Sequence, residues 1–222
     1  MRALKFTPSN SKLSDSEIIY RVIAGEKELY ELLLRRNNQK LFRVIRGYIK
    51  DTYEVEDVMQ DTYIKAYEKL HLYKHMSKFS TWLIRIGINE ALARLKQKGK
   101  IRFIDSTSNE SNTNQTISMR KNQQLSPEEI MIQQEGKFII EKAIDLLDSK
   151  HKVVFIMKEV EGMSIKEISE CLDLSTSNVK VRLHRAKAML KEKLIEIHLK
   201  KDVFEFGFSR CDNIVSQVMK KI

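Results

Sequence analysis

The sequence predicts an all-α protein made of two small helical domains. Apolar residues recur every three or four positions over most of the chain, and long segments lack the alternation that is typical of strands. The 222 residues include only two prolines and seven glycines, so few turn signals interrupt the helices. One polar segment near the middle separates two groups of helical patterns, and an amphipathic stretch follows the second group.

Charge and composition restrict the classes of partner. The formal net charge is +10 and the isoelectric point is about 9.5, which favours polyanions such as DNA, RNA, an anionic membrane or an acidic protein. No run approaches 18 apolar residues, and Met1 opens a polar segment rather than a signal peptide. Cys171 and Cys211 lie far apart, without zinc-ligand spacing. We therefore expect a soluble, cytoplasmic protein with reduced cysteines and no membrane insertion.

The first predicted domain spans residues 1–99. Ser14 and Glu17 form a capping box that begins a short helix, and Gly25 is placed to close it. A second helix carries one apolar stripe from Leu29 to Tyr48. Residues 50–54 have the composition of a turn.

Two further helices complete this domain. The third is expected from about Val55 to Leu70, with an inner apolar face and an acidic outer face. After a loop at 71–78, the fourth begins near Phe79 and ends at Gly99. Its predicted core residues are Trp82, Leu83 and Ile86.

Residues 100–125 are predicted to be a flexible linker. From position 105 onward Ser, Thr, Asn and Gln dominate, and almost no apolar residue remains. Such a segment cannot bury enough apolar surface to offset the entropy of ordering it.

The second predicted domain spans residues 126–197. Ser126 and Pro127 are typical of a helix start, and this helix is expected to reach about Leu147. A second helix is expected over 150–161, where Gly162 ends it, with Val153, Phe155 or Ile156, Met157 and Val160 buried.

Residues 164–190 predict a helix-turn-helix. Ser164 and Glu167 form another capping box before a short helix, and Asp173-Leu174-Ser175 make a tight turn. The next helix places Val179, Leu183, Ala186 and Leu190 on one face and basic residues on the rest. A short helix, a tight turn and a longer basic helix are typical of DNA-binding modules, in which the second helix enters the major groove.

The last residues, 198–222, form a C-terminal extension. Its apolar residues from Cys211 onward recur at helical spacing, which predicts an amphipathic helix. It either packs on the second domain or docks a partner protein.

Three sequence motifs, in this order, resemble those of sigma-70 transcription initiation factors. They are VEDVMQDTY at 55–63, FSTWLIRIGIN at 79–89, and EGMSIKEIS with VKVRLHRAK within 161–187. The chain is similar to the extracytoplasmic-function (ECF) subgroup, which keeps only sigma regions 2 and 4. The resemblance covers about residues 13–97 and 126–195. It implies a helical-bundle region 2 and a helix-turn-helix region 4, which together direct core RNA polymerase to specific promoters.

The resemblance assigns roles to three groups of residues. The acidic face of the third helix is implied to dock the coiled coil of the largest polymerase subunit, and region 4 the polymerase flap; an anti-sigma factor is a further candidate partner. Residues implied for polymerase binding are Glu56, Asp57, Gln60 and Asp61. Those implied for the minus-ten DNA are Tyr73, Lys74, Phe79, Trp82 and Asn89. Those implied for the minus-thirty-five DNA are Lys158, Asn178, Lys180, Val181, Arg182, His184 and Arg185.

Simpler interpretations stand beside several of these roles. Trp82 suits the core, Asn89 suits a hydrogen bond to a neighbouring loop, and an acidic helix face is ordinarily solvated. Many family members have Arg-Gly-Asp or a similar sequence where this loop has Lys74-His75-Met76, so the family's minus-ten sequence does not transfer. Many also have glycine where this chain has Asp173, which tolerates left-handed geometry.

Two other classes of function compete with an initiation factor. One is a DNA-binding regulator that acts without polymerase, although the first domain shows no sensor or phosphoacceptor pattern. The other is a metal-dependent nuclease using Glu54, Glu56, Asp57 and Asp61, but adjacent residues on a helix point apart and no second carboxylate cluster is visible. We expect no catalytic residues, no metal and no cofactor.

Overall fold

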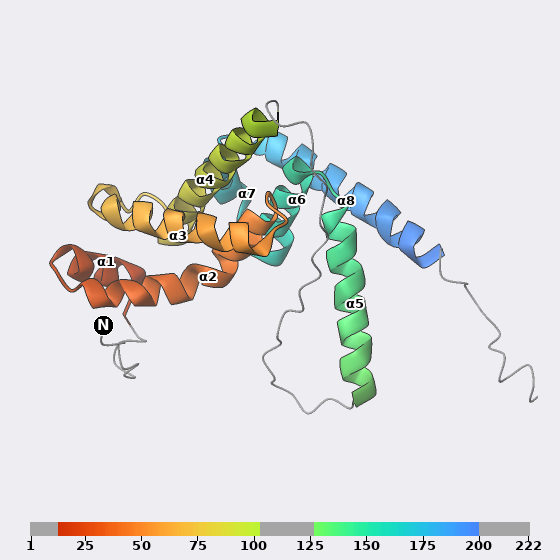
Figure 1. The fold of residues 1–222 in the computed structure, drawn as a ribbon, viewed down its shortest axis with the longest axis horizontal. Coiled ribbons are helices and arrows are strands. Elements are labelled where there is room, and N and C mark those ends of the chain that lie inside the picture. The colour runs from red at the N-terminus through yellow and green to blue at the C-terminus, as the bar shows by residue number, and fades with distance from the viewer. Residues whose placement is uncertain (1–12, 103–126, 200–222) are drawn as a thin grey trace, which may run out of the picture. The chain divides into compact units, whose positions relative to one another are not determined.

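The computed structural model describes residues 13–102 and 127–199, and every regular element in these ranges is helical (Figure 1). The N-terminal helices are α1 (Asp15–Ile23), the 3-10 turn η2 (Lys27–Leu29), α2 (Tyr30–Arg46), α3 (Thr52–Glu68), the 3-10 turn η3 (Leu70–Leu72) and α4 (Phe79–Arg102). The later elements are α5 (Pro127–Asp145), α6 (Ser149–Phe155), the π-helical turn η4 (Ile156–Val160), α7 (Ile165–Leu172) and α8 (Thr176–Leu199). The all-α prediction is confirmed.

The described residues belong to two compact units. The first contains α1–α4 together with residues 147–187, and therefore holds α6, η4, α7 and the first half of α8. The second contains α5 and the remainder of α8. The first unit thus draws on segments from both predicted domains. The expected linker and C-terminal extension lie outside the described residues, apart from their edges, and so does the Ser126 cap.

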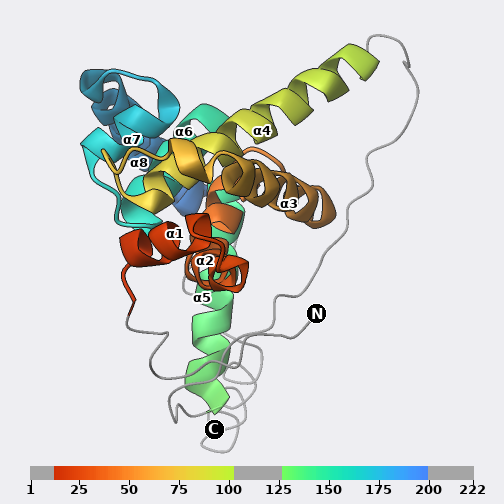
Figure 2. The same ribbon diagram turned by 90° about the vertical axis from the view of Figure 1, so that its left-hand side faces the viewer.

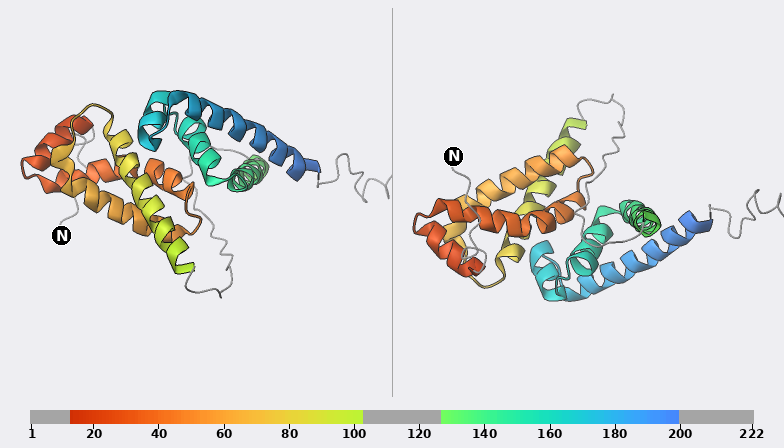
Figure 3. Two further views of the ribbon diagram at one scale, coloured as in Figure 1. Left: turned by 90° about the horizontal axis from the view of Figure 1, so that it is seen from above. Right: turned by 90° about the horizontal axis from the view of Figure 1, so that it is seen from below.

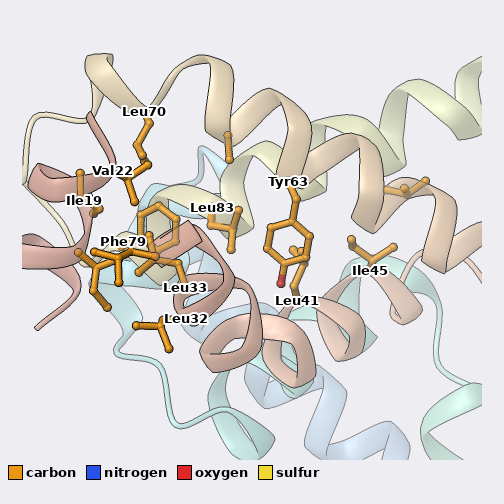
Figure 4. Close-up of a cluster of buried hydrophobic side chains, with 14 of the residues drawn as sticks. Ile19, Val22, Leu32, Leu33, Leu41, Ile45, Tyr63, Leu70, Phe79 and Leu83 are labelled. Atoms are coloured by element: carbon orange, nitrogen blue, oxygen red, sulfur yellow. The ribbon is translucent and has the colours of Figure 1, made fainter. Parts of the chain in front are cut away.

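A bundle of α1–α4 encloses the larger of two apolar cores in the first unit. Leu33, Leu41, Ile45 and Leu83 are completely buried there, and Phe79 and Leu70 close one end (Figure 4). Trp82 and Ile86 are only partly buried and pack against this core. The prediction that α4 buries Leu83 is therefore confirmed, while Trp82 and Ile86 lie at the edge of the core.

The fourth helix is apolar on a second side that the sequence analysis did not identify. Ile84 and Ile88 are 1% and 3% exposed and belong to a separate core with Val153, Met157 and Ile168. Figures 1 and 2 show α7 beside the first half of α4. The first half of α4 is therefore buried between two cores, which explains why its apolar residues do not follow a single stripe.

Two boundaries differ from the sequence prediction. Residues 50–54 are not a turn, because Asp51 caps α3 by accepting a hydrogen bond from the Glu54 backbone N–H at 2.9 Å, and the helix begins at Thr52. The polar residues that suggested a turn are the capping sequence itself. Helix α4 also continues through Gly99 to Arg102, since a glycine inside a helix costs only about 1 kcal/mol.

The caps of the short helices are confirmed. Ser14 and Ser164 each form both halves of a capping box, with Glu17 and Glu167 respectively. Gly25 follows the C-cap of α1 with φ +115°, a conformation that favours glycine.

Candidate protein- and DNA-binding surfaces

The acidic residues of α3 form one continuous exposed face. Val55 and Val58 lie on the opposite, buried side of the helix, and the helical repeat of 3.6 residues places the polar side chains on the outer side of each turn. All four residues predicted for polymerase binding lie on this exposed side: Glu56, Asp57, Gln60 and Asp61.

Ion pairs connect α3 to the neighbouring α4. Lys98 Nζ lies 2.6 Å from Glu54 Oε2, and Lys65 Nζ lies 2.6 Å from Glu90 Oε2. Between them Arg94 Nη2 lies 3.8 Å from Asp57 Oδ2, and the Asp57 side chain remains 64% exposed. Such exposed pairs contribute little to stability, so Asp57 remains available to another cation.

Exposed apolar side chains on the same two helices were missed by the sequence analysis. Tyr53 and Ile64 of α3 are 66% and 58% exposed, and Leu92 and Leu95 of α4 are also exposed. Large apolar side chains beside a charged rim are typical of protein-binding surfaces. The only sign of this surface in the sequence is that these apolar residues lie outside the apolar stripe that each helix buries in the core.

The loop before α4 and the start of α1 form an open pocket of about 370 Å³. Aromatic contacts shape the loop, since the ring of Tyr73 lies 4.5 Å from His75 and 5.4 Å from Trp82. The Tyr73 hydroxyl donates to the Ser77 carbonyl, and burial raises its pKa. The lining residues are Asp15, Ser16, Tyr73, His75, Met76, Ser77, Lys78 and Phe79.

The five residues predicted for the minus-ten DNA do not all meet at this pocket. Tyr73 and Phe79 line it, although Phe79 is only 2% exposed and also belongs to the core. Trp82 is not a lining residue, but its ring packs against those of Tyr73 and Phe79, with centroids 5.4 and 5.8 Å away. Lys74 is exposed on the loop but is not a lining residue. Asn89 is exposed on α4, about 15 Å along the helix from Phe79 at 1.5 Å per residue.

Helices α7 and α8 form the predicted helix-turn-helix, and Figure 3 shows them meeting at a tight turn. Asp173 adopts a left-handed conformation with φ +53° at the C-cap of α7. The Ser169 hydroxyl donates to the Leu174 carbonyl, and the Ser175 hydroxyl accepts from the Asn178 backbone N–H at 3.2 Å. These bonds fix the direction in which α8 leaves the turn.

The left-handed residue in this turn yields a stability prediction. Asp173→Gly is expected to raise the free energy of unfolding by about 1 kcal/mol, because glycine adopts this conformation without steric cost. Asp173→Val is expected to lower it by a similar or larger amount, since a β-branched side chain is strained there. Urea unfolding followed by circular dichroism measures both, and equal stability of the two variants would contradict the assigned backbone geometry.

The residues predicted for the minus-thirty-five DNA fall into two groups. Four are exposed on α8: Lys180, Val181, His184 and Arg185. The other three make contacts within the protein. Arg182 Nε donates to Asn178 Oδ1 at 2.8 Å, and Lys158 Nζ donates to the Met163 carbonyl at 3.2 Å.

No group of three or more His, Cys, Asp or Glu side chains is placed to hold a metal ion in the described residues. Within the same residues, no helix is both long and apolar enough to span a bilayer. Cys171 is buried with a free thiol, and burial raises its pKa to about 12; Cys211 lies outside the described residues.

Comparison with known families identifies the chain. The family model for sigma-70 region 2 matches residues 33–101, and that for sigma-70 region 4 matches residues 137–190. The chain belongs to the sigma-70 family. Region 2 of this sigma factor therefore carries the acidic α3 and the loop pocket, and region 4 carries the helix-turn-helix.

Curated relatives assign the sigma factor to the ECF subgroup. It is 28% identical to the ECF RNA polymerase sigma-E factor of Haemophilus influenzae over 183 residues, covering 82% of this chain and 96% of the relative. It is also 28% identical to the factor of the same name from Escherichia coli K12 over 192 residues, covering 83% and 96%. As a member of this family, the chain is a promoter-specific transcription initiation factor.

Solved structures show the same fold. A complex of the sigma factor RpoE with the anti-sigma factor NepR from Bartonella quintana matches with a TM-score of 0.61 and 19% identity, covering 78% of this chain and 98% of that chain. CnrH, in complex with the cytosolic domain of CnrY, matches with a TM-score of 0.54 and 21% identity, covering 85% and 99%.

Proposed function

We propose that this sigma factor carries two different DNA-binding devices and one polymerase-docking surface, each on its own element. The observation that carries the proposal is the presence in one chain of a capped helix-turn-helix and a loop pocket walled by aromatic rings. The first device suits duplex DNA, because a helix fits the major groove. The second suits an unpaired base, because aromatic faces stack bases removed from the duplex.

The polymerase-docking surface is assigned to the outer face of α3. Its exposed carboxylates suit a basic partner, and the adjacent exposed side chains of Ile64 and Leu92 supply apolar area. In a chain with a net charge of +10, an acidic face is a poor DNA contact and a good protein contact. Glu56, Asp57, Gln60 and Asp61 are assigned to the largest-subunit coiled coil by family resemblance.

The minus-thirty-five element is assigned to the exposed side of α8. Arg185 and Lys180 project from its first half, where a recognition helix contacts base edges and phosphates. Guanidinium groups pair with guanine edges, and lysines mainly with phosphates. Val181 and His184 lie between them in the sequence, and Asn178 and Arg182 are hydrogen-bonded to each other on the same helix. Lys158 of η4 is assigned to this DNA element by family resemblance.

We propose that the active protein consists of two domains joined by a flexible linker. Residues 1–99 act as region 2 and 126–197 as region 4, with 100–125 between them and 198–222 as an extension. We further infer that the chain acts in the cytoplasm with polymerase and catalyses no reaction itself.

An anti-sigma factor is a further proposed partner. The RpoE structure that shares this fold holds the anti-sigma factor NepR. Because that likeness shows the fold alone, the partner of this chain is inferred from family membership and not from shared contact residues.

The minus-ten assignment is tested by strand opening. Asn89→Ala is expected to slow open-complex formation on duplex promoters, because an amide that bonds an extruded base edge helps to offset the unstacking cost of a few kcal/mol. The defect is expected to shrink on a template that is already melted at the minus-ten element. Permanganate footprinting of the promoter bubble measures both.

Gln97→Ala is the matched control, since Gln97 is an exposed amide two turns further along α4. The control is expected to open promoters at the wild-type rate. If Asn89→Ala does so as well, Asn89 is not part of the strand-binding site.

A further inference from the structure

Helix α1 forms part of the wall of the loop pocket, although no residue of this helix is among those predicted for the minus-ten DNA. Asp15 and Ser16, in the first turn of α1, line the pocket together with the loop residues. Ile19, one turn further along, is 1% exposed and shares the buried core with Phe79 (Figure 4). Helix α1 also contacts η3, which leads into the loop. This packing fixes the position of α1 relative to the loop.

The carboxylate of Asp15 is oriented by a single arginine. Its Oδ1 accepts a hydrogen bond from Nη1 of Arg36 at 2.7 Å, and Nη2 of Arg36 donates to the Leu13 carbonyl at 2.8 Å. Within residues 13–102 and 127–199, Oδ2 of Asp15 has no hydrogen-bond or ion-pair partner. Asp15 is therefore held in place by one oxygen and offers the other oxygen to a ligand of the pocket.

Ser16 places a hydroxyl group beside this acceptor. Its Oγ lies 3.5 Å from Nδ1 of His75, a long contact between α1 and the loop. A hydroxyl group rotates freely and both donates and accepts, so Ser16 can donate to a ligand in the pocket. Burial first, and then the nearby charge of Asp15, raise the pKa of Tyr73. The polar groups of α1 thus lie close to the aromatic wall of the pocket.

The aromatic walls suit any base and do not choose among the four. Tyr73 and Phe79 line the pocket, and their rings meet edge to face with centroids 5.9 Å apart. Every base has a π-face, so stacking tolerates all sequences. Lys78 is 77% exposed, which suits a contact with the phosphate backbone, and phosphates carry no sequence information. Selection among bases therefore depends on the polar groups that meet the base edge.

The two α1 side chains offer an acceptor beside a donor. An ionised carboxylate can only accept hydrogen bonds, so Oδ2 of Asp15 requires an N–H from the base. Adenine and cytosine both present an exocyclic amine, which donates, beside a ring nitrogen, which accepts. This edge complements Asp15 followed by Ser16. The pairing of a carboxylate with the cytosine amine is also a common contact in protein–DNA complexes.

Guanine and thymine fit the same two groups poorly. The ring N–H of thymine lies between two carbonyl oxygens, and these oxygens repel an approaching carboxylate. Guanine presents two adjacent N–H donors, which match a carboxylate with both oxygens free. Oδ1 of Asp15 is already bound to Arg36, so this double contact is not available.

We propose that Asp15 and Ser16 of α1 make the loop pocket selective for an amino base, adenine or cytosine, over guanine and thymine. The inference rests on the proposed function, in which this pocket holds an extruded base of the minus-ten strand. Oδ2 of Asp15 accepts from the exocyclic amine, and the Ser16 hydroxyl donates to the neighbouring ring nitrogen. The base identity at this position is therefore set by a helix outside the loop, together with the loop itself.

The test measures the affinity of the assembled holoenzyme for a melted minus-ten strand. The full chain is combined with core polymerase and titrated with a fluorescent fork template that is duplex upstream and single-stranded over the minus-ten element. Each of the four bases is placed in turn at each minus-ten position. At one position we expect the wild-type complex to bind adenine or cytosine about tenfold more tightly than guanine or thymine.

Asp15→Asn is the decisive variant. Its amide oxygen can still accept from Arg36, so folding should be unaffected, but the amide nitrogen also donates to carbonyl oxygens. The amino-base preference at that one position should fall to about twofold or less, and preferences at the other positions should remain. Glu28→Gln is the matched control, because Glu28 is an exposed carboxylate outside the pocket, and it should keep every wild-type preference.

A base without its exocyclic amine tests the contact directly. Purine in place of adenine, or 2-pyrimidinone in place of cytosine, should weaken binding of the wild-type complex by about tenfold and leave Asp15→Asn nearly unaffected. Ser16→Ala should lower the amino-base preference by about threefold, the effect of one neutral hydrogen bond. If circular dichroism shows that Asp15→Asn does not fold, the modified bases and Ser16→Ala take its place.

Two results would overturn the inference and leave the proposed function standing. One is an amino-base preference that is unchanged by Asp15→Asn, or by Ser16→Ala where that variant takes its place, at every minus-ten position. The other is a variant whose loss of affinity falls on guanine or thymine. A wild-type holoenzyme with no base preference anywhere in the melted strand would instead overturn the proposed function of the loop pocket.

Discussion

Replacing Asp57 and Asp61 by lysine is expected to weaken binding to core polymerase by on the order of a hundredfold. Each reversal removes an attractive charge and adds a repulsive one at a surface assigned to a basic partner. We expect a loss of affinity of about tenfold per position, and the two losses should multiply. Both side chains are exposed, so folding should be unaffected. Fluorescence anisotropy of labelled sigma factor titrated with core polymerase measures the loss.

The double variant Glu26→Lys with Glu28→Lys is the matched control. It makes the same change in net charge at two exposed positions outside the docking surface, both at η2. Its affinity for core polymerase should remain within about threefold of wild type, the size of a long-range charge effect. Equal losses in both double variants would show that net charge, and not the α3 face, determines binding.

Arg185→Ala is expected to cost roughly 1–3 kcal/mol of binding to the preferred duplex and to relax specificity at one base position. The reason is that a guanidinium pairs with both acceptors of a guanine edge, which alanine cannot replace. The side chain is exposed on α8, so the effect should appear in DNA binding and not in stability. Selection of bound duplexes from a randomised minus-thirty-five library, followed by affinity measurement at fixed salt, gives both quantities.

Lys187→Ala serves as the comparison for Arg185→Ala. Lys187 Nζ lies 2.9 Å from Glu159 Oε1, so its charge is partly occupied within region 4. Lys187→Ala should reduce the salt dependence of DNA binding by at most the equivalent of about one phosphate contact, and the ranking of DNA sequences by affinity should stay unchanged. If Lys187→Ala changes the ranking and Arg185→Ala does not, α8 contacts DNA through a different face.

Local chemistry explains which parts of this fold were predictable. Ser164 with Glu167 and Ser175 after Asp173 specify the helix-turn-helix through hydrogen bonds within a few residues, and all of these caps are present. The start of α3 was misassigned because Asp51 and Thr52 have turn-like composition, although Asp51 acts as a cap. The π-helical turn at Ile156–Val160 has no composition signal of its own.

Long-range contacts account for the remaining differences. The periodicity of α4 predicted one buried face, but Ile84 and Ile88 are buried against residues that lie 60 or more positions away. Nothing in the local pattern identifies that partner surface. The local pattern also does not identify Arg43 as the partner of Glu161, because the two residues lie 118 positions apart in the sequence. It does not give the distance between Asn89 and the loop pocket either, because that distance depends on where α4 begins.

The central claim is that this chain gives core RNA polymerase its promoter specificity. The most direct measurement is transcription by core polymerase on a library of genomic fragments from the same organism, with and without the purified chain, and mapping of the start sites. The account predicts that the chain creates a defined set of starts, preceded by common minus-ten and minus-thirty-five sequences, and that Asp57→Lys with Asp61→Lys abolishes them. Start sites that are unchanged by the wild-type chain, despite its binding to DNA, would contradict the account and favour a regulator that acts without polymerase.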